Sequence, residues 1–182
     1  ALDQKPGREN KQRCRALWQD PQGQIWLLSR DYLYLFDEEQ RKLKPMPDPK
    51  DQQGRVLDIS YKEFYPDHKG NLWIMTWEGG AVYFSTGEQK FLQELNVPKS
   101  LRPLAALHFD ANGTLWMGGK NRIAFRTTES DSVQFLDDLN LDTTLNNQLR
   151  GIAPDRKGNL WVGVSKRGVL KITPLTGGKP RH

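Results

Sequence analysis

Cysteine, long apolar runs and dense blocks of positive charge are nearly or wholly missing from this sequence. The single cysteine, Cys14, excludes an internal disulfide and any cysteine-rich metal site. No apolar run approaches the roughly 20 residues that a membrane-spanning helix needs. The 27 Lys and Arg residues against 22 Asp and Glu give a net charge of +5, but they are dispersed along the chain. We therefore expect neither a membrane span nor a nucleic-acid partner in this chain.

Motifs of catalysis and of metal or cofactor binding are also missing. The chain has three histidines, and no pair of His, Cys or acidic residues has the spacing of a metal site. Gly-x-Ser-x-Gly, the phosphate loop and the dinucleotide fingerprint do not occur. The sequence thus predicts no cofactor, no metal and no enzymatic activity. Residue 1 is not Met and no signal-peptide pattern follows it, so we expect the chain to begin partway into its gene product.

What the sequence does contain is a repeat rich in aromatic residues. Six Trp, seven Phe and five Tyr are too many for a disordered chain. The heptapeptide Asp-x-x-Gly-x-(Ile/Leu)-Trp occurs four times, with about 45 residues from one copy to the next. Its defining residues are Asp20, Gly23, Trp26, Asp67, Gly70, Trp73, Asp110, Gly113, Trp116, Asp155, Gly158 and Trp161.

Each position of the heptapeptide has a physical role. The Asp opens a turn, because its side chain can accept the backbone N–H two residues later. The Gly suits a short hairpin that needs a positive φ. The Trp, at one place in every repeat, can bury a large area between sheets and donate its indole N–H to a neighbour. Cys14 falls on a predicted strand before the first heptapeptide, and we expect it to be a buried, inert thiol.

Short strands surround every heptapeptide. A first strand precedes the Asp, at 15–18, 62–65, 105–108 and 150–153, and a second contains the Trp. Third strands are expected at 32–36, 81–84, 122–126 and 169–172, and fourth strands at 43–46, 91–95 and 133–136. Four strands in about 45 residues is the size of a propeller blade.

The predicted fold class is therefore all-β, with four four-stranded antiparallel β-propeller blades. The blades would span about 14–56, 57–100, 101–145 and 146–182, after a polar N-terminal segment or completing strand at 1–13. Four blades are few for a ring. They are compatible with part of a larger ring that includes further blades of the parent chain, with a closed four-blade ring, or with a homodimer that completes eight blades.

The best-formed copies resemble the two-component regulator propeller repeat of bacterial sensor proteins. Residues 146–152 read Asn-Asn-Gln-Leu-Arg-Gly-Ile, and 155–163 read Asp-Arg-Lys-Gly-Asn-Leu-Trp-Val-Gly. Residues 70–76 and the Gly-Gly-Ala at 79–81 match most of the remaining pattern. The family's Gly-Thr after the Trp is replaced in every copy. The resemblance covers about residues 14–172 and implies a non-catalytic sensor or ligand-recognition domain in the periplasm or another extracytoplasmic place.

In propellers, ligands usually meet the central channel and the loops that join second to third strands and fourth to first strands. This architecture implies a basic face with an aromatic rim, suited to a small-molecule or glycan ligand that is anionic. The candidate ligand-binding residues are Arg15, Arg30, Lys62, Trp77, Glu78, Lys120, Arg150, Lys166 and Arg167. The competing interpretation is that these cations are solvated or bind blade edges.

Two other functions fit the same repeat. A propeller lyase of the streptogramin-inactivating type would need a general base, for which His108 is the candidate. A protein-interaction scaffold would use the faces of the ring and no small ligand.

Overall fold

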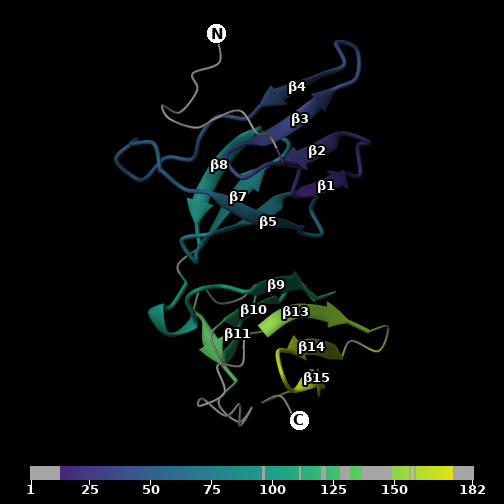
Figure 1. Ribbon diagram of the computed structural model, residues 1–182, viewed down its shortest axis with the longest axis vertical. Coiled ribbons are helices and arrows are strands. Elements are labelled where there is room, and N and C mark those ends of the chain that lie inside the picture. The colour runs from purple at the N-terminus through teal and green to yellow at the C-terminus, as the bar shows by residue number, and fades with distance from the viewer. Residues whose placement is uncertain are drawn as a thin grey trace.

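The computed structural model describes residues 13–95, 97–110, 112–119, 122–127, 132–136, 149–155, 157 and 159–173. Within them, fifteen strands form four antiparallel sheets, which follow one another in chain order in Figure 1. We call these sheets blades one to four. The single helical segment among the described residues is a short 3-10 turn, η1 (Lys99–Leu101), between blades two and three.

Within each blade, every strand pairs with the next strand in the chain, so each blade is a meander. Blade one contains β1 (Ala16–Gln19), β2 (Ile25–Leu28), β3 (Leu33–Asp37) and β4 (Lys42–Pro45). Blade two contains β5 (Tyr61–Pro66), β6 (Leu72–Thr76), β7 (Ala81–Ser85) and β8 (Lys90–Glu94). Blade three contains β9 (Ala106–Phe109), β10 (Leu115–Gly119), β11 (Arg122–Arg126) and β12 (Gln134–Phe135). Blade four contains β13 (Leu149–Pro154), β14 (Leu160–Val164) and β15 (Gly168–Ile172).

The all-β propeller prediction is confirmed, and the strands begin and end within about two residues of their expected positions. Three blades have the expected four strands, and blade four has three described strands. The expected N-terminal segment at 1–13 lies almost wholly outside the described residues. Within the described part of the chain, no helix is long and apolar enough to cross a membrane.

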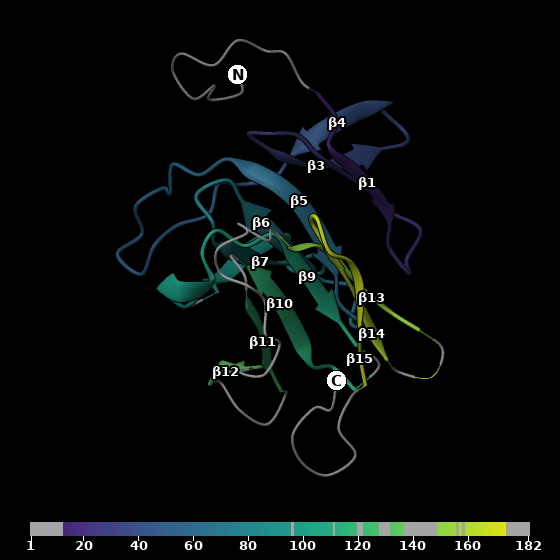
Figure 2. The same ribbon diagram turned by 60° about the horizontal axis from the view of Figure 1, so that its bottom comes forward.

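The core consists of three apolar layers, each between two consecutive blades. Blades one and two pack through Trp26, Leu28 and Phe84. Met75 and Met117 lie between blades two and three, and Trp116 and Val162 lie between blades three and four. The first strands of blades three and four, β9 and β13, contact each other, while β12 lies at the periphery (Figure 2).

Blades one and four do not close a ring. They lie at opposite ends of the stack in Figure 1, and none of the apolar layers formed by described residues joins them. The outward faces of these two blades carry Leu17 and Val169, which are 62% and 63% exposed. The described residues therefore do not form the closed four-blade ring, which was one of the three alternatives.

The repeated Asp organises each hairpin turn. Asp20 Oδ1 accepts the backbone N–H of Gln22 at 3.0 Å and of Gln24 at 2.8 Å. The same two bonds recur at Asp67, Asp110 and Asp155. The glycines have φ of +85° at Gly23 and +79° at Gly70 and Gly113, whereas Gly158 lies outside the described residues. The expected turn chemistry is confirmed where it is described.

The second oxygen of the turn carboxylate binds the repeated Trp. Trp26 Nε1 donates to Asp20 Oδ2 at 2.9 Å, so the neighbour that receives the indole N–H belongs to the same repeat. In blade four the bonds from Asn159, its side chain first, together with the Trp161 indole lower the pKa of Asp155 to about 2. Turn, second strand and indole are thus held by one carboxylate.

Two burial predictions are wrong. Trp161 is 41% exposed, whereas the other three repeated Trp residues are buried, because its face of blade four contacts no described blade. Cys14 is exposed instead of buried, because β1 begins only at Ala16 and Cys14 lies before it.

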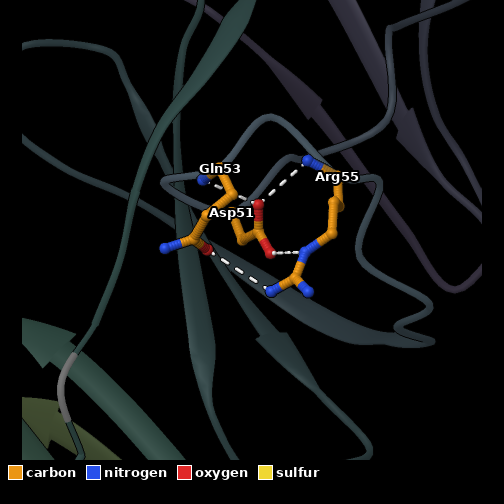
Figure 3. A network of polar contacts seen from close by, with 3 residues as sticks. All are labelled: Asp51, Gln53 and Arg55. Atoms are coloured by element: carbon orange, nitrogen blue, oxygen red, sulfur yellow. Dashed lines mark hydrogen bonds and ion pairs between the residues drawn. The ribbon is translucent and has the colours of Figure 1, made fainter.

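The segment between blades one and two contains a fifth turn of the same kind. Asp51 Oδ1 accepts the N–H of Gln53 and of Arg55, each at 2.9 Å, and Gly54 has φ of +79°. Arg55 Nε takes the place of the indole and donates to Asp51 Oδ2 at 2.7 Å (Figure 3). These bonds, the Arg55 N–H bond most, lower the pKa of Asp51. Residues 51–54 share the Asp-x-x-Gly spacing of the repeat, but none of the sequence predictions includes this turn.

Candidate functional site

The loop between β6 and β7 presents the Trp77 side chain. Gly79 N–H donates to the Thr76 carbonyl at 3.2 Å, and Thr76 N–H donates to the Gly80 carbonyl at 3.0 Å, which closes a tight turn. Gly79 has φ of +87°, and a Cβ there would lie 3.0 Å from Pro103 Cα, so the turn requires glycine. Trp77 projects from this fixed turn and is 52% exposed.

Glu78 holds the same loop against the segment that precedes β5. Its two carboxylate oxygens accept the Ser60 N–H at 3.1 and 3.2 Å. The Ser60 carbonyl in turn accepts the Trp77 N–H at 2.8 Å. Glu78 therefore positions the Trp77 loop, and a direct contact between Glu78 and a ligand stays a prediction.

Two cations from different blades contact the Trp77 ring. The Arg15 guanidinium carbon lies 5.3 Å from the ring centre, and Lys62 Nζ lies 5.8 Å from it. Both distances are within the range of cation–π attraction. Arg15 directly precedes β1 and Lys62 lies near the start of β5, so equivalent positions of blades one and two converge on one indole.

A third cation, Arg150, approaches Lys62 from blade four. Partial burial lowers the pKa of Lys62, and the positive charge of Arg150 lowers it further, while Glu63 opposes the shift. Lys62 Nζ donates to the Leu104 carbonyl at 3.4 Å. Arg150 Nε donates to Ser165 Oγ at 2.8 Å, which orients its guanidinium. Their mutual repulsion would be relieved by an anion placed between them.

A cavity of about 520 Å³ opens beside these residues. Blade two contributes its aromatic residue and most of its polar residues, and the connection between blades two and three contributes most of the apolar wall. Blades three and four contribute Gly119, Leu149 and Arg150. Gly119 lines the cavity, and a Cβ there would clash with the backbone of Leu101. The lining residues are Lys62, Glu63, Thr76, Trp77, Pro103, Leu104, Ala105, Gly119, Leu149 and Arg150. We call this the Trp77 cavity.

The structure brings together only some of the candidate binding residues. Lys62, Trp77 and Arg150 line the Trp77 cavity, and Arg15 contacts its indole. Arg30 lies outside this lining, and its carbonyl accepts the Tyr61 N–H. Lys166 and Arg167 occupy the turn between β14 and β15 at the same end of blade four, with Lys166 at φ of +66°. Lys120 lies outside the described residues.

Sequence reasoning missed the apolar half of the cavity. Pro103 and Leu104 belong to the connection between blades two and three, which carries no repeat pattern. Gly119 and Leu149 lie at the ends of strands. Aligning the four copies would have placed Gly119 at the position of Thr76 and Leu149 at that of Tyr61, each next to a candidate binding residue of blade two. That alignment was the available signal for them.

His108, the candidate base of a lyase, lies elsewhere. It pairs in register with Trp116 on the face of β9 that contacts blade four, and it does not line the Trp77 cavity. Its Nε2 is buried and has no partner in the described part of the chain. Burial lowers the pKa of His108, and the charge of Asp110 opposes this shift.

No family model and no curated protein matches the chain. Among solved structures, it is similar to the extracellular domain of a proposed hybrid two-component system from B. thetaiotaomicron. That match has 18% identity and a TM-score of 0.66, and it covers 87% of this chain and 21% of that domain. The chain thus spans about a fifth of that domain's length.

Two further structures have other functions. Virginiamycin B lyase from Staphylococcus aureus has 14% identity and a TM-score of 0.64, over 97% of this chain and 62% of the lyase. PorZ, a bacterial surface component of the type-IX secretion system of Porphyromonas gingivalis, has 16% identity and a TM-score of 0.62, over 91% of this chain and 28% of PorZ. At these identities the likeness establishes the fold alone: the chain is a β-propeller, whose fold is shared by an extracellular sensor-system domain, a lyase and a secretion-system component.

Proposed function

We propose that the chain is a non-catalytic, extracytoplasmic ligand-recognition propeller of a bacterial signal-transduction protein, with its ligand in the Trp77 cavity. The observation that carries this proposal is the convergence of Arg15, Lys62 and Arg150 around a half-exposed Trp beside that cavity. The fold likeness to an extracellular domain of a two-component system supports it.

The expected ligand is an anionic glycan or another carboxylate with a flat face. The exposed part of the Trp77 indole offers a surface on which a sugar ring can stack. A carboxylate close to Lys62 and Arg150 would offset the repulsion between their two positive charges. The cavity volume of about 520 Å³ suits a ligand of one or two sugar rings.

A ligand bound in the Trp77 cavity would affect how blades two, three and four pack against one another. The lining comes from blades two, three and four, so a bound ligand would contact three sheets at once. A ligand that prefers one arrangement of these sheets shifts the equilibrium toward it by its differential affinity. That shift is the signal that we propose is passed to the rest of the signalling protein.

The test is calorimetric titration with α-1,4-linked digalacturonate and with its methyl ester, a neutral compound of nearly the same shape. We expect the acid to bind and the ester to bind at least about tenfold more weakly, since charged hydrogen bonds are worth about 1.5–3 kcal/mol. Trp77→Ala and Lys62→Met should each weaken binding of the acid. Trp161→Ala is the matched control, because Trp161 is also partly exposed but lies on the outward face of blade four.

Three outcomes would overturn the proposal. These are equal affinity for acid and ester, an unchanged affinity in Trp77→Ala, and an equal loss in Trp161→Ala. The lyase alternative has its own test, turnover of a streptogramin by the wild-type chain that is lost on His108→Ala. Such turnover would replace the non-catalytic proposal.

A further inference from the structure

Blade two departs from the Asp–Trp bond of the other blades. In blades one, three and four the indole Nε1 donates to Oδ2 of the turn Asp, at 2.9, 2.9 and 3.1 Å. In blade two the Tyr83 hydroxyl occupies that oxygen, donating to Asp67 Oδ2 at 3.0 Å. Burial, followed by the charge of Asp67 and this bond, raises the pKa of Tyr83 to about 12, so the hydroxyl is a donor at neutral pH.

The consequence is an indole N–H that is available to another acceptor. Trp73 is 3% exposed, and within the described residues its Nε1 has no hydrogen-bond partner. The one fully buried side-chain polar atom without a partner in the described part of the chain is His108 Nε2, so the Trp73 N–H is not sealed off from an incoming acceptor. The ring of Trp73 is held by Tyr83, at 4.8 Å between ring centres, and by Phe109 at 6.3 Å.

Trp73 lines a second, smaller cavity of about 250 Å³. This cavity lies beyond the end of β5 and before the start of β10, whereas the Trp77 cavity lies at the opposite ends of these strands. Its lining residues are Asp67, His68, Lys69, Trp73, Tyr83, Phe109, Gly113, Leu115, Arg126 and Thr127. We call this the Trp73 cavity.

The charged groups of the Trp73 cavity favour an anion. The Arg126 guanidinium carbon lies 5.7 Å from the centre of the Trp73 ring. Neither Arg126 nor Lys69 has an ion-pair partner within the described part of the chain. The one carboxylate, Asp67, already accepts hydrogen bonds from two backbone N–H groups and from Tyr83. Donors thus outnumber free acceptors, beside the aromatic wall of Phe109.

We propose that the Trp73 cavity is a second binding site, which takes a small aromatic carboxylate. The ring of the ligand would pack against Phe109, and its carboxylate would accept from the Trp73 indole N–H and from Arg126. A volume of about 250 Å³ admits one ring with its carboxylate and excludes an oligosaccharide. This site is independent of the Trp77 cavity and of the function proposed for it.

The direct test is NMR of the indole N–H signals in a protein labelled with ¹⁵N. The Trp73 signal is identified as the one missing from Trp73→Phe. Sodium benzoate is titrated at constant ionic strength, with benzyl alcohol as the neutral analogue. We expect a saturable downfield shift of the Trp73 signal with benzoate and none with benzyl alcohol. No shift, or an equal shift with benzyl alcohol, would overturn the proposal.

Two variants separate this site from general anion binding. Arg126→Gln should weaken benzoate binding about tenfold, as expected for one charged hydrogen bond, whereas Arg55→Gln, at an exposed arginine, should not. Tyr83→Phe frees Asp67 Oδ2 for the indole, so benzoate should bind more weakly although both cations remain. Trp77→Ala should leave benzoate affinity unchanged. An unchanged affinity in both Arg126→Gln and Tyr83→Phe would refute the assignment.

Discussion

Replacing a repeated Trp by Phe should cost far more stability in blade one than in blade four. Trp26 and Trp161 occupy the same position of the repeat, and each donates its indole N–H to the carboxylate six residues earlier. Their surroundings differ, since Trp26 is 0% exposed and Trp161 is 41% exposed. The pair therefore separates the effect of burial from the effect of the bond.

The magnitudes follow from these surroundings. Trp26→Phe removes a buried hydrogen bond to a carboxylate, worth about 1.5–3 kcal/mol, and leaves unfilled volume in the layer with Phe84. We expect a total loss of about 3 kcal/mol in the free energy of unfolding. Trp161→Phe removes a bond that water can replace, and we expect a loss below about 1 kcal/mol.

Urea unfolding followed by far-UV circular dichroism measures both losses without relying on the altered fluorophore. With a slope of about 2 kcal/mol per M, the midpoint should fall by about 1.5 M for Trp26→Phe and by less than about 0.5 M for Trp161→Phe. Equal losses would refute the reasoning, because they would mean that the outward face of blade four is covered in solution.

Three other predictions concern the turns and the outer blades. Gly79→Ala should destabilise the chain by about 1–3 kcal/mol in urea unfolding, against about 1 kcal/mol for Gly54→Ala, since both have positive φ but only Gly79 lacks room for a Cβ. Hydrogen bonds lower the pKa of Asp155 to about 2, against about 3.9 in the unfolded chain. The ionised Asp155 therefore stabilises the fold fully above about pH 4, and this stabilisation is lost as the pH falls to about 2. Asp155→Asn should flatten the free energy of unfolding as a function of pH over that range. Exposed Leu17 and Val169 should promote association between copies of the chain. Light scattering at high concentration should therefore give a lower mass for the double variant Leu17→Lys, Val169→Lys than for the wild type. Equal masses would contradict this.

The repeat could be read from the sequence because its chemistry is local. The bonds of Asp20 reach only as far as Trp26, so seven residues are enough to specify the turn and the start of the next strand. Strand alternation then predicts the blade. The turn at Asp51 follows the same local rule, but a search for the turn only together with the Trp misses it.

Burial and the makeup of the cavity could not be predicted in the same way, because they depend on contacts between blades. Trp161 has the same local sequence as the buried Trp residues and differs only in what its face meets. Leu104 reaches the Trp77 cavity through a connection that carries no motif. The Ser60 N–H that Glu78 accepts is 18 residues away in the chain, so no local pattern predicts that bond.

The departures from the repeat gather in blade two. Three blades bind the Trp indole to the turn carboxylate, whether the Trp is buried or exposed, so this bond belongs to the hairpin and does not need a neighbouring blade. In blade two Tyr83 replaces the indole at Asp67, and Trp73 faces a cavity. At the other end of the same blade Trp77, an extra aromatic residue outside the repeat, stands among cations. Departures from local rules are expected at functional sites, so these two departures are the observations from which we propose a binding site at each end of blade two.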